Sequence, residues 1–453
     1  MTTTGSSAAH LAASYIAGMR LPGKIFSART TILAIGLTVC ACHGSQPSVA
    51  PSSQRQAPDT SRIRQDITYL ASDALEGRGT GTRGNDLAAA YIAKRFSDLG
   101  LTAPVGGFLQ RFEARSAAAA HQGLAAELRT QNVVGLIPGR DSALRGEYVV
   151  LGAHFDHLGR ESFGALDTQS RGVVRNGADD NASGTVAIME LAQMLRANPT
   201  KRSVVVVAFS GEEIGLLGSA HFVSQPPSPV KTDSVYAMLN FDMVGRVRND
   251  RLLIFGTATA VEWPAVLTAA NGTTQFTLAQ IGDGFGPSDH SSFFGRNIPV
   301  LHFFSDNHDD YHRASDDAHL INVAGVARVV RLAERLVRDI GDRDRRLTFV
   351  QAAASARPSA RTGSQAYLGS VPDMAAGDRP GLRLTGVTAG SPADRAGLKT
   401  GDIVISLGGR EVSDLNTYSD ALYAHQPGDE VVIVVLRGSE RLTLRATLGR
   451  RGQ

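Results

Sequence analysis

Three apolar runs in this sequence each end in polar residues that can carry chemistry. They are residues 148–153, 204–209 and 235–241. The first runs into His154, the second into Glu212 and Glu213 after a Ser-Gly pair, and the third into Asp242. Short apolar runs of this kind predict buried strands, and in open α/β sheets ligands bind beyond the carboxyl ends of the strands. We therefore expect these polar side chains to converge, although they lie far apart in the sequence.

Apolar residues at helical spacing predict helices on either side of these runs. One predicted helix carries Ile63 and Ile67 on one face, and others cover residues 85–100, 183–197 and 321–340. The last has apolar residues at the spacing of an amphipathic helix that packs on a core. Strands and helices that alternate in this way predict an α/β domain with helices against a sheet.

Five side chains form a candidate metal-binding set. They are His154, Asp179, Glu213, Asp242 and His312. Imidazoles mixed with carboxylates suit Zn²⁺, and also Mn²⁺ or Co²⁺. Five side chains exceed what one tetrahedral catalytic zinc takes from protein, whereas two metals that share a carboxylate use all five. A paired site of this kind lowers the pKa of a bridging water and polarises a carbonyl, so the set indicates metal-assisted hydrolysis.

The acidic string 179–181 also fits a second role. Asp and Asn are good helix N-caps, and the predicted helix begins at Ser183. Both roles can hold together, because one residue of the string can bind metal while another caps the helix.

The strings that carry these residues resemble a known family. They are His154-Phe155-Asp156, residues 177–184 (Gly-Ala-Asp-Asp-Asn-Ala-Ser-Gly), residues 210–213 (Ser-Gly-Glu-Glu), residues 240–242 (Asn-Phe-Asp) and Tyr311-His312. Together they resemble the M28 family of di-zinc aminopeptidases, over residues 61–343. The resemblance implies the zinc exopeptidase fold, a mixed β-sheet sandwiched by helices, and a zinc metallopeptidase activity.

The resemblance also implies roles for the ligands. His154 and Asp242 would hold one zinc, Glu213 and His312 the other, and Asp179 would bridge the two. The family further has a cis peptide in the aspartate pair, here expected between Asp179 and Asp180.

Three further residues would support catalysis by the same resemblance. Glu212 matches the general base that moves a proton from the bridging water to the leaving amine. Asp156 matches the carboxylate that orients His154, and Tyr311 matches a tyrosine that hydrogen-bonds the oxyanion in some members. Asp289 and His290 lie in a string that resembles a segment lining the site. We expect them to contact the metal ligands without binding metal themselves.

Several other residues are better explained without a role in the site. His157, His221, His302 and His308 are expected to be surface or core histidines. The glycine-rich segment 76–82 resembles the opening of many M28 domains and predicts a shaped loop, because no strand precedes it with a phosphate-binding pattern.

Length and composition exclude some classes of protein. A chain of 453 residues exceeds what one hydrophobic core organises, so at least two domains are expected. Apolar residues make up 42%, charged residues 20%, and the formal net charge is +3. Because the basic residues are scattered, they predict a solvated surface and no nucleic-acid partner.

The N-terminal residues resemble an export signal. Residues 19–24 are basic, and residues 31–39 form an apolar run too short for a stable membrane anchor. Both cysteines lie here, and the string ending at Cys42 resembles a lipobox in which that residue is lipidated. We expect a leader at residues 1–43, a Ser- and Pro-rich tether at 44–60, and a periplasmic or secreted protein, with Cys42 as candidate lipoprotein anchor.

A second domain is expected at the C-terminus. Residues 344–364 are polar and rich in Ala and Ser, which predicts a linker. Residues 386–404 resemble the bacterial PDZ pattern, residues 367–369 its carboxylate-binding loop, and residues 415–423 the helix beside its groove. The resemblance implies a small β-rich PDZ domain at residues 365–450 that regulates the protein or binds a peptide or protein, or that serves only for packing or dimerisation.

The interpretation that follows is an exported hydrolase that removes N-terminal residues from peptides. An M28-like carboxypeptidase and a glutaminyl cyclase are alternatives within the same fold. A non-catalytic M28 scaffold that acts as a binding protein is a third, and it is disfavoured because Glu212 and all five candidate ligands are present.

Overall fold

The computed structural model describes residues 57–115, 127–160, 165, 167, 172–286, 288–351, 366–372, 381–388, 390–412, 418, 421–422 and 424–450. The predicted leader, Cys42 and nearly all of the tether lie outside the described residues, as does the linker after residue 351. No helix in these described ranges is long and apolar enough to cross a membrane.

The larger region is built on one eight-stranded sheet. Its strands are β1 (Leu109–Arg115), β2 (Glu127–Ile137), β3 (Tyr148–His154), β4 (Ser203–Phe209), β5 (Val235–Phe241), β6 (Arg251–Phe255), β7 (Thr277–Ile281) and β8 (Val300–Phe304). They lie in the order β1-β2-β4-β3-β5-β8-β6-β7. The three apolar runs that predicted strands form β3, β4 and β5, which are buried along their whole length.

The centre of this sheet is parallel, strands on either side of it pair antiparallel, and the edge strand β7 pairs in parallel with β6. β3 pairs in parallel with β4 and β5, and β5 pairs in parallel with β8. β1, β2 and β4 pair antiparallel, as do β6 and β8. The prediction of a mixed sheet is confirmed, and its parallel centre brings the ends of β3, β4, β5 and β8 to one edge.

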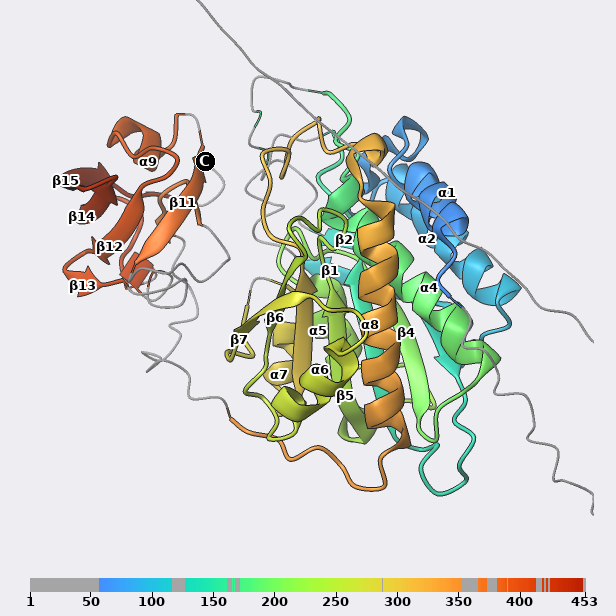
Figure 1. The fold of residues 1–453 in the computed structure, drawn as a ribbon. Helices are drawn as coiled ribbons and strands as arrows, with labels where there is room; N and C mark the ends of the chain where they lie inside the picture. Colours follow the sequence, from blue (N-terminus) through green and yellow to red (C-terminus); the bar gives the residue numbers. More distant parts are fainter. Residues whose placement is uncertain are drawn as a thin grey trace, which may run out of the picture. The chain divides into compact units, whose positions relative to one another are not determined.

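Helices cover both faces of the sheet. They are α1 (Thr60–Leu70), α2 (Arg83–Asp98), α4 (Gly184–Ala197), α5 (Leu217–Ser224), α6 (Trp263–Asn271), α7 (His290–Phe294) and α8 (Val323–Asp342). Figure 1 shows α1, α2, α4 and α8 over one face of the sheet, where α8 packs on α1, α4 and α6. The helices α5 and α7 pack together and belong to a separate apolar cluster.

Alternation along the central strands divides the core between the two faces. In β4, Val204, Val206 and Ala208 face the cluster formed with α1, α2, α4, α6 and α8, whereas Val205 and Val207 face the cluster of α5 and α7. Successive side chains of a strand point to opposite faces, so a continuous apolar run is what a strand covered on both sides requires.

The predicted helices are present with small shifts at their ends. Thr82 caps α2, its Oγ1 accepting the N–H of Asn85, and Gly100 follows that helix with φ 70°. The helix predicted from Ser183 is α4, where Asn181 Oδ1 accepts the N–H of Gly184 at 2.9 Å. One residue of the acidic string therefore caps α4.

The C-terminal region is a separate antiparallel β-structure. Its strands are β9 (Ala366–Tyr367), β10 (Ser370–Pro372), β11 (Leu382–Val387), β12 (Ile403–Leu407), β13 (Arg410–Glu411), β14 (Glu430–Arg437), β15 (Glu440–Thr447) and β16 (Gly449–Arg450), with a short helix α9 (Pro392–Arg395). One sheet runs β10-β11-β12-β14-β15 with β13 on β12, and β9 pairs with β16. Its core contains Leu384, Val404 and Ile433 and draws only on residues 366–448. The predicted β-rich second domain is confirmed, and the helix expected at residues 415–423 lies largely outside the described residues.

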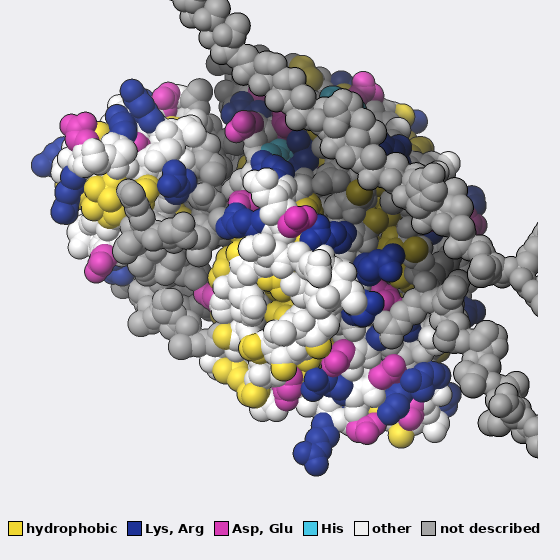
Figure 2. Space-filling view, in the orientation of Figure 1, with side chains coloured by type: hydrophobic (Ala, Val, Ile, Leu, Met, Phe, Trp, Pro, Cys, Tyr) yellow, Lys and Arg dark blue, Asp and Glu magenta, His cyan; other side chains and the backbone are white. Residues whose placement is uncertain are grey.

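Charged side chains are distributed as the sequence predicts. Figure 2 shows Lys and Arg interspersed with Asp and Glu over the visible face of the molecule. Opposite charges also pair along one helix, as in the bond from Arg338 to Glu334 on α8.

We predict that deleting residues 365–453 leaves the larger region folded, because its apolar clusters draw only on residues 63–349. A thermal melt should retain one cooperative transition within a few degrees of that of the full chain. Val330→Asp, which buries a charge in α8, is the destabilised control. A truncated protein that melts without cooperativity would show that the two regions fold as one.

Candidate metal centre

The predicted side chains meet at the carboxyl edge of the parallel strands. His154 is the last residue of β3, Glu212 and Glu213 follow β4, and Asp242 follows β5. His312 lies in the loop after β8 and has φ 54°. Two groups have ligand atoms within 4.8 Å of one another, namely His154 with Asp180 and Glu213, and His154 with Glu212 and Asp242.

The distances divide the centre into two halves that share one carboxylate. In one half, His154 Nε2 lies 3.2 Å from Asp242 Oδ1. In the other, His312 Nε2 lies 3.3 Å from Glu213 Oε2. Asp180 joins them, because its Oδ1 is 3.4 Å from His154 Nε2 and its Oδ2 is 3.1 Å from His312 Nε2.

The expected position of the shared carboxylate is therefore wrong by one residue. Asp180, and not Asp179, lies between the two histidines. The cis peptide is displaced in the same way and joins Asp180 to Asn181. The backbone leaves helical geometry at Asp180, with φ −107° and ψ 90°, so neighbouring side chains of this string point in different directions.

Asp179 instead points into the protein and stabilises the loop. Its Oδ1 accepts the N–H of Gly245 at 2.6 Å and the hydroxyl of Ser183 at 2.9 Å. Its Oδ2 lies 3.2 Å from His308 Nε2. The buried carboxylate of Asp316 completes this support, since its Oδ2 accepts the backbone N–H groups of both Asp179 and Asp180.

Asp156 supports His154 as the sequence resemblance implied. Its backbone carbonyl lies 3.2 Å from His154 Nδ1, and its Oδ1 lies 3.8 Å from the same nitrogen. The carboxylate is fully buried and accepts the hydroxyl of Thr80 and the backbone N–H of Glu212. The glycine-rich segment 76–82 is thus a shaped loop that braces the orienting carboxylate.

Arg78, in the same segment, ties the surrounding loops together. It is fully buried and donates to the carbonyls of Leu70, Phe155, Asn176 and Gly177. Burial lowers the pKa of this guanidinium to about 10, which leaves it charged at neutral pH. Sequence reasoning missed this residue, because its partners are backbone carbonyls that no side-chain motif reveals.

The remaining predicted residues lie close to the centre. The Tyr311 ring stacks on His312 with ring centroids 3.8 Å apart, and burial raises the pKa of its hydroxyl well above the usual value. Asp289 and His290 are fully buried, and the His290 ring stacks on His302 at 4.4 Å.

The four histidines left without a role have different outcomes. His302 is a core histidine and contacts Asn240, and His221 stacks on Phe112 away from the centre. His308 faces Asp179, as described above. His157 belongs to the site, although the sequence did not predict it. Its Nδ1 lies 2.8 Å from Glu213 Oε1. Its place three residues after His154 on the same strand end was the available signal.

Charge outweighs burial at the two histidines. Burial favours the neutral form of His154, but the carboxylates of Asp242 and Glu212 hold the pKa of this imidazole well above its ordinary value. Burial acts in the same way on His312, and the charges of Glu213 and Asp180 raise its pKa well above the ordinary value.

The carboxylates divide into two kinds. Burial opposes ionisation of Asp180, yet hydrogen bonds from the two histidines hold the pKa of this carboxyl well below its usual range. At Glu213 the histidine partners likewise overcome burial and the charge of Asp180, and the pKa falls to about 2. At Glu212 burial dominates, only partly opposed by His154, and raises the pKa well above its usual value. The surroundings therefore favour the protonated form of Glu212 and the ionised forms of Asp180 and Glu213.

This donor set fits divalent cations. Two ligand atoms on one tetrahedral zinc lie roughly 3.4 Å apart, given bonds of about 2.0–2.2 Å. The four distances that join the histidines to Asp180, Glu213 and Asp242 run from 3.1 to 3.4 Å. In the described ranges no Lys or Arg forms an ion pair with these carboxylates, so the buried negative charge calls for bound cations.

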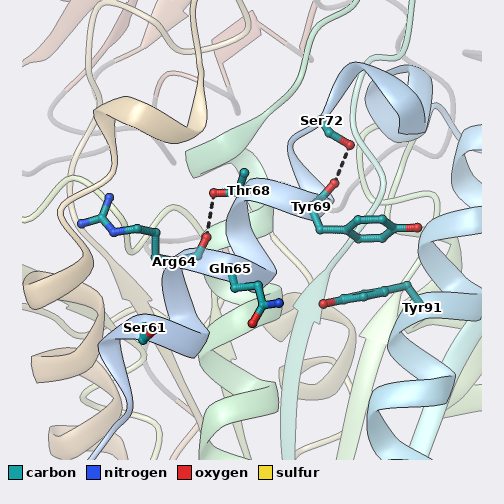
Figure 3. Close-up of a pocket in the computed structure, with 7 residues that line it drawn as sticks. All are labelled: Ser61, Arg64, Gln65, Thr68, Tyr69, Ser72 and Tyr91. Atoms are coloured by element: carbon teal, nitrogen blue, oxygen red, sulfur yellow. Dashed lines mark hydrogen bonds between the residues drawn. The ribbon is translucent and has the colours of Figure 1, made fainter.

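A surface hollow elsewhere contains none of these residues. It measures about 640 Å³ and lies between α1 and α2, lined by Ser61, Arg64, Gln65, Thr68, Tyr69, Ser72 and Tyr91. Figure 3 shows the two tyrosine rings next to each other in it, with centroids 4.2 Å apart and ring planes tilted by 30°. Its lining includes no acidic residue or histidine.

Each of the two regions matches the model of a known protein family. Residues 132–337 match the family model described as Peptidase family M28, and residues 364–448 match the model described as PDZ domain.

Two curated relatives match the larger region. The alkaline phosphatase isozyme conversion protein of Escherichia coli (strain K12) is 28% identical over 216 residues, which are 47% of this chain and 57% of that protein. Aminopeptidase YwaD of Bacillus subtilis (strain 168) is 33% identical over 135 residues, 28% of each chain. The chain thus spans between about a quarter and a little over half of the length of these relatives.

A solved structure shares the fold. BSAP, a zinc aminopeptidase from Bacillus subtilis, superposes with a TM-score of 0.51 at 18% sequence identity, over 64% of this chain and 97% of that one. At this identity the likeness establishes the architecture of the larger region.

We predict that the two neighbouring aspartates respond differently to the same change. Asp180→Asn should weaken cation binding by at least about tenfold, because it removes the charge shared by both halves. Asp179→Asn keeps an oxygen for Gly245 and should retain the cation content of the wild type. Bound metal measured by atomic emission after gel filtration checks this. The opposite order of effects would return the shared position to Asp179.

Proposed function

Residues 132–337 of this chain form a domain of peptidase family M28, and from this premise we propose that the protein is a zinc aminopeptidase with a two-metal centre. It would hydrolyse the N-terminal peptide bond of peptides. The observation that carries the proposal is the meeting of two histidines, Asp180, Glu213 and Asp242 at one edge of the sheet, with Glu212 beside them.

In this proposal each half of the centre holds one cation. His154 and Asp242 would hold the first, Glu213 and His312 the second, and Asp180 would be shared between them. Two zinc ions so held would polarise the substrate carbonyl and make a water acidic enough to attack it at neutral pH. Mn²⁺ or Co²⁺ would suit the same nitrogen and oxygen ligands.

The chain supplies the proton transfer and the orientation. Glu212 accepts the proton of the attacking water and donates it to the leaving amine, a task that needs a carboxyl whose pKa is raised toward the working pH. Tyr311 keeps its hydroxyl proton and donates a hydrogen bond to the developing oxyanion. Asp156 holds His154 in the orientation that turns Nε2 toward the centre.

Action at the N-terminus of peptides rests on the relatives. Aminopeptidase YwaD and BSAP carry that activity in their names. A carboxypeptidase of the same fold, which would need cationic groups for the substrate carboxylate, is the alternative. A glutaminyl cyclase with one zinc is disfavoured by the second half of the centre. A non-catalytic scaffold is disfavoured by the presence of Glu212 beside a full set of candidate ligands.

We also propose that the protein acts outside the cytoplasm. The support is the basic and apolar pattern of residues 19–39, followed by Cys42 as the candidate lipid attachment site. The PDZ domain would bind an extended peptide or a protein partner and so regulate or place the peptidase.

The function is tested with purified full-length protein and a panel of aminoacyl chromogenic amides. We expect turnover that stops after dialysis against a chelator and returns with Zn²⁺, Mn²⁺ or Co²⁺. An N-acetylated amide is the matched control, since an aminopeptidase requires a free amine. Turnover that survives complete metal removal, or that prefers the blocked substrate, would reject the proposal.

Glu212→Gln isolates the proton transfer. The amide keeps the shape of the side chain and cannot accept the proton, so kcat should fall by about 10²- to 10⁴-fold while both cations remain bound. Metal content is measured on the same samples. Unchanged kcat would remove Glu212 from the proposed role.

A further inference from the structure

We propose that His157 is a positioning residue of the metal centre, which fixes Glu213 through one oxygen so that the other oxygen faces the cation. The inference rests on the proposed function, since it assumes that Glu213 binds metal. It assigns a role to a third imidazole at the centre, which the resemblance to M28 did not provide.

His157 is buried against the centre and held there from two sides. Its exposed fraction is 2%, and its backbone N–H donates to the carbonyl of Arg78. Gly177, at φ 53°, lies against the ring, because a Cβ at that position would fall 2.5 Å from His157 Cδ2. A side chain larger than glycine at position 177 would therefore clash with the His157 ring.

The imidazoles of His157 and His312 flank Glu213 from different sides. His157 Nδ1 lies 2.8 Å from Oε1, while His312 Nε2 lies 3.3 Å from Oε2. The two rings are 5.7 Å apart at an interplanar angle of 71°. Each carboxylate oxygen thus has its own nitrogen partner.

The two distances differ in the way a hydrogen bond differs from shared metal ligation. Atoms that share a tetrahedral zinc lie roughly 3.4 Å apart, which the contact with His312 matches. The contact with His157 is shorter and has the length of a charge-assisted N–H···O bond. The next acidic oxygen, Asp180 Oδ2, is 3.7 Å from the same nitrogen. His157 therefore contacts the ligand and not the cation.

The hydrogen bond defines the tautomer of the ring. An ionised carboxylate only accepts hydrogen bonds, so Nδ1 of His157 carries the proton. Its Nε2 has no hydrogen-bond partner among the residues that the structure describes. Only Nδ1 of this imidazole therefore contacts the centre. A substitute side chain must place its donor nitrogen at the same distance from the backbone.

The matched variants differ in that distance. In His157→Asn the amide nitrogen is as many bonds from Cβ as Nδ1 is, whereas in His157→Gln it lies one bond further. His157→Ala removes the donor. His221→Asn, at a half-buried histidine packed on Phe112 away from the centre, controls for loss of an imidazole.

Metal-stripped full-length proteins are titrated with Co²⁺ by calorimetry and by visible absorption. We expect two cations in the wild type and an affinity for one of them reduced about 10- to 100-fold in the Ala and Gln variants. His157→Asn should recover that affinity to within a few-fold, with the Co²⁺ absorption spectrum of the wild type. Thermal melts verify that each variant is folded, and the Asn and Gln pair decides the test if the Ala variant is not.

Three results would overturn the inference. The first is wild-type affinity for the cation in the Ala variant. The second is an equal loss of affinity in the Asn and Gln variants with a changed Co²⁺ spectrum, which direct ligation by His157 predicts. The third is a wild type that binds no cation. A wild type that binds two cations but cleaves no aminoacyl amide would reject the proposed function alone.

Discussion

The parallel pairing of β3 with β4 and β5 is the constraint on which the rest of this centre depends. His154 stands opposite Phe209, and Gly152 stands opposite Asn240, so the three strands end within a few residues of one another. Because each strand is buried on both faces, sliding one past its neighbour would break core contacts on two sides at once. The register therefore holds acidic groups close together although they repel one another.

Crowded acidic groups make this edge electrostatically costly without compensation. Asp180, Glu213 and Asp242 face one another across a few ångströms, and their direct partners in the described structure are imidazoles. The protein lowers the pKa of Asp180 and Glu213 and raises that of Glu212 within one cluster, so adjacent carboxylates in the sequence acquire opposite properties. Such separation of pKa values is what divides ligands from proton carriers in an active site.

The sequence predicts most of this arrangement because the relevant signals are local. Apolar runs mark the strands, and the polar residues that follow them mark His154, Glu213 and Asp242. The shared carboxylate was misplaced by one position, because Asp179 and Asp180 are chemically identical and only the backbone torsions of the loop select between them. His157 and Arg78 depend on partners distant in the chain, such as Glu213 and the carbonyl of Asn176. The place of His157 three residues after His154 was the one local signal, and no local pattern identifies the partners of Arg78.

The buried guanidinium of Arg78 has a consequence for where the catalytic unit begins. It precedes the matched family segment, which starts at residue 132, yet it joins the end of α1 to the loops after β3 and before α4. Removal of the residues before that segment would leave the carbonyls of Phe155, Asn176 and Gly177 without the Arg78 donor. Exchange of this stretch between relatives would succeed only if the arginine and the loops that accept from it were inherited as a set.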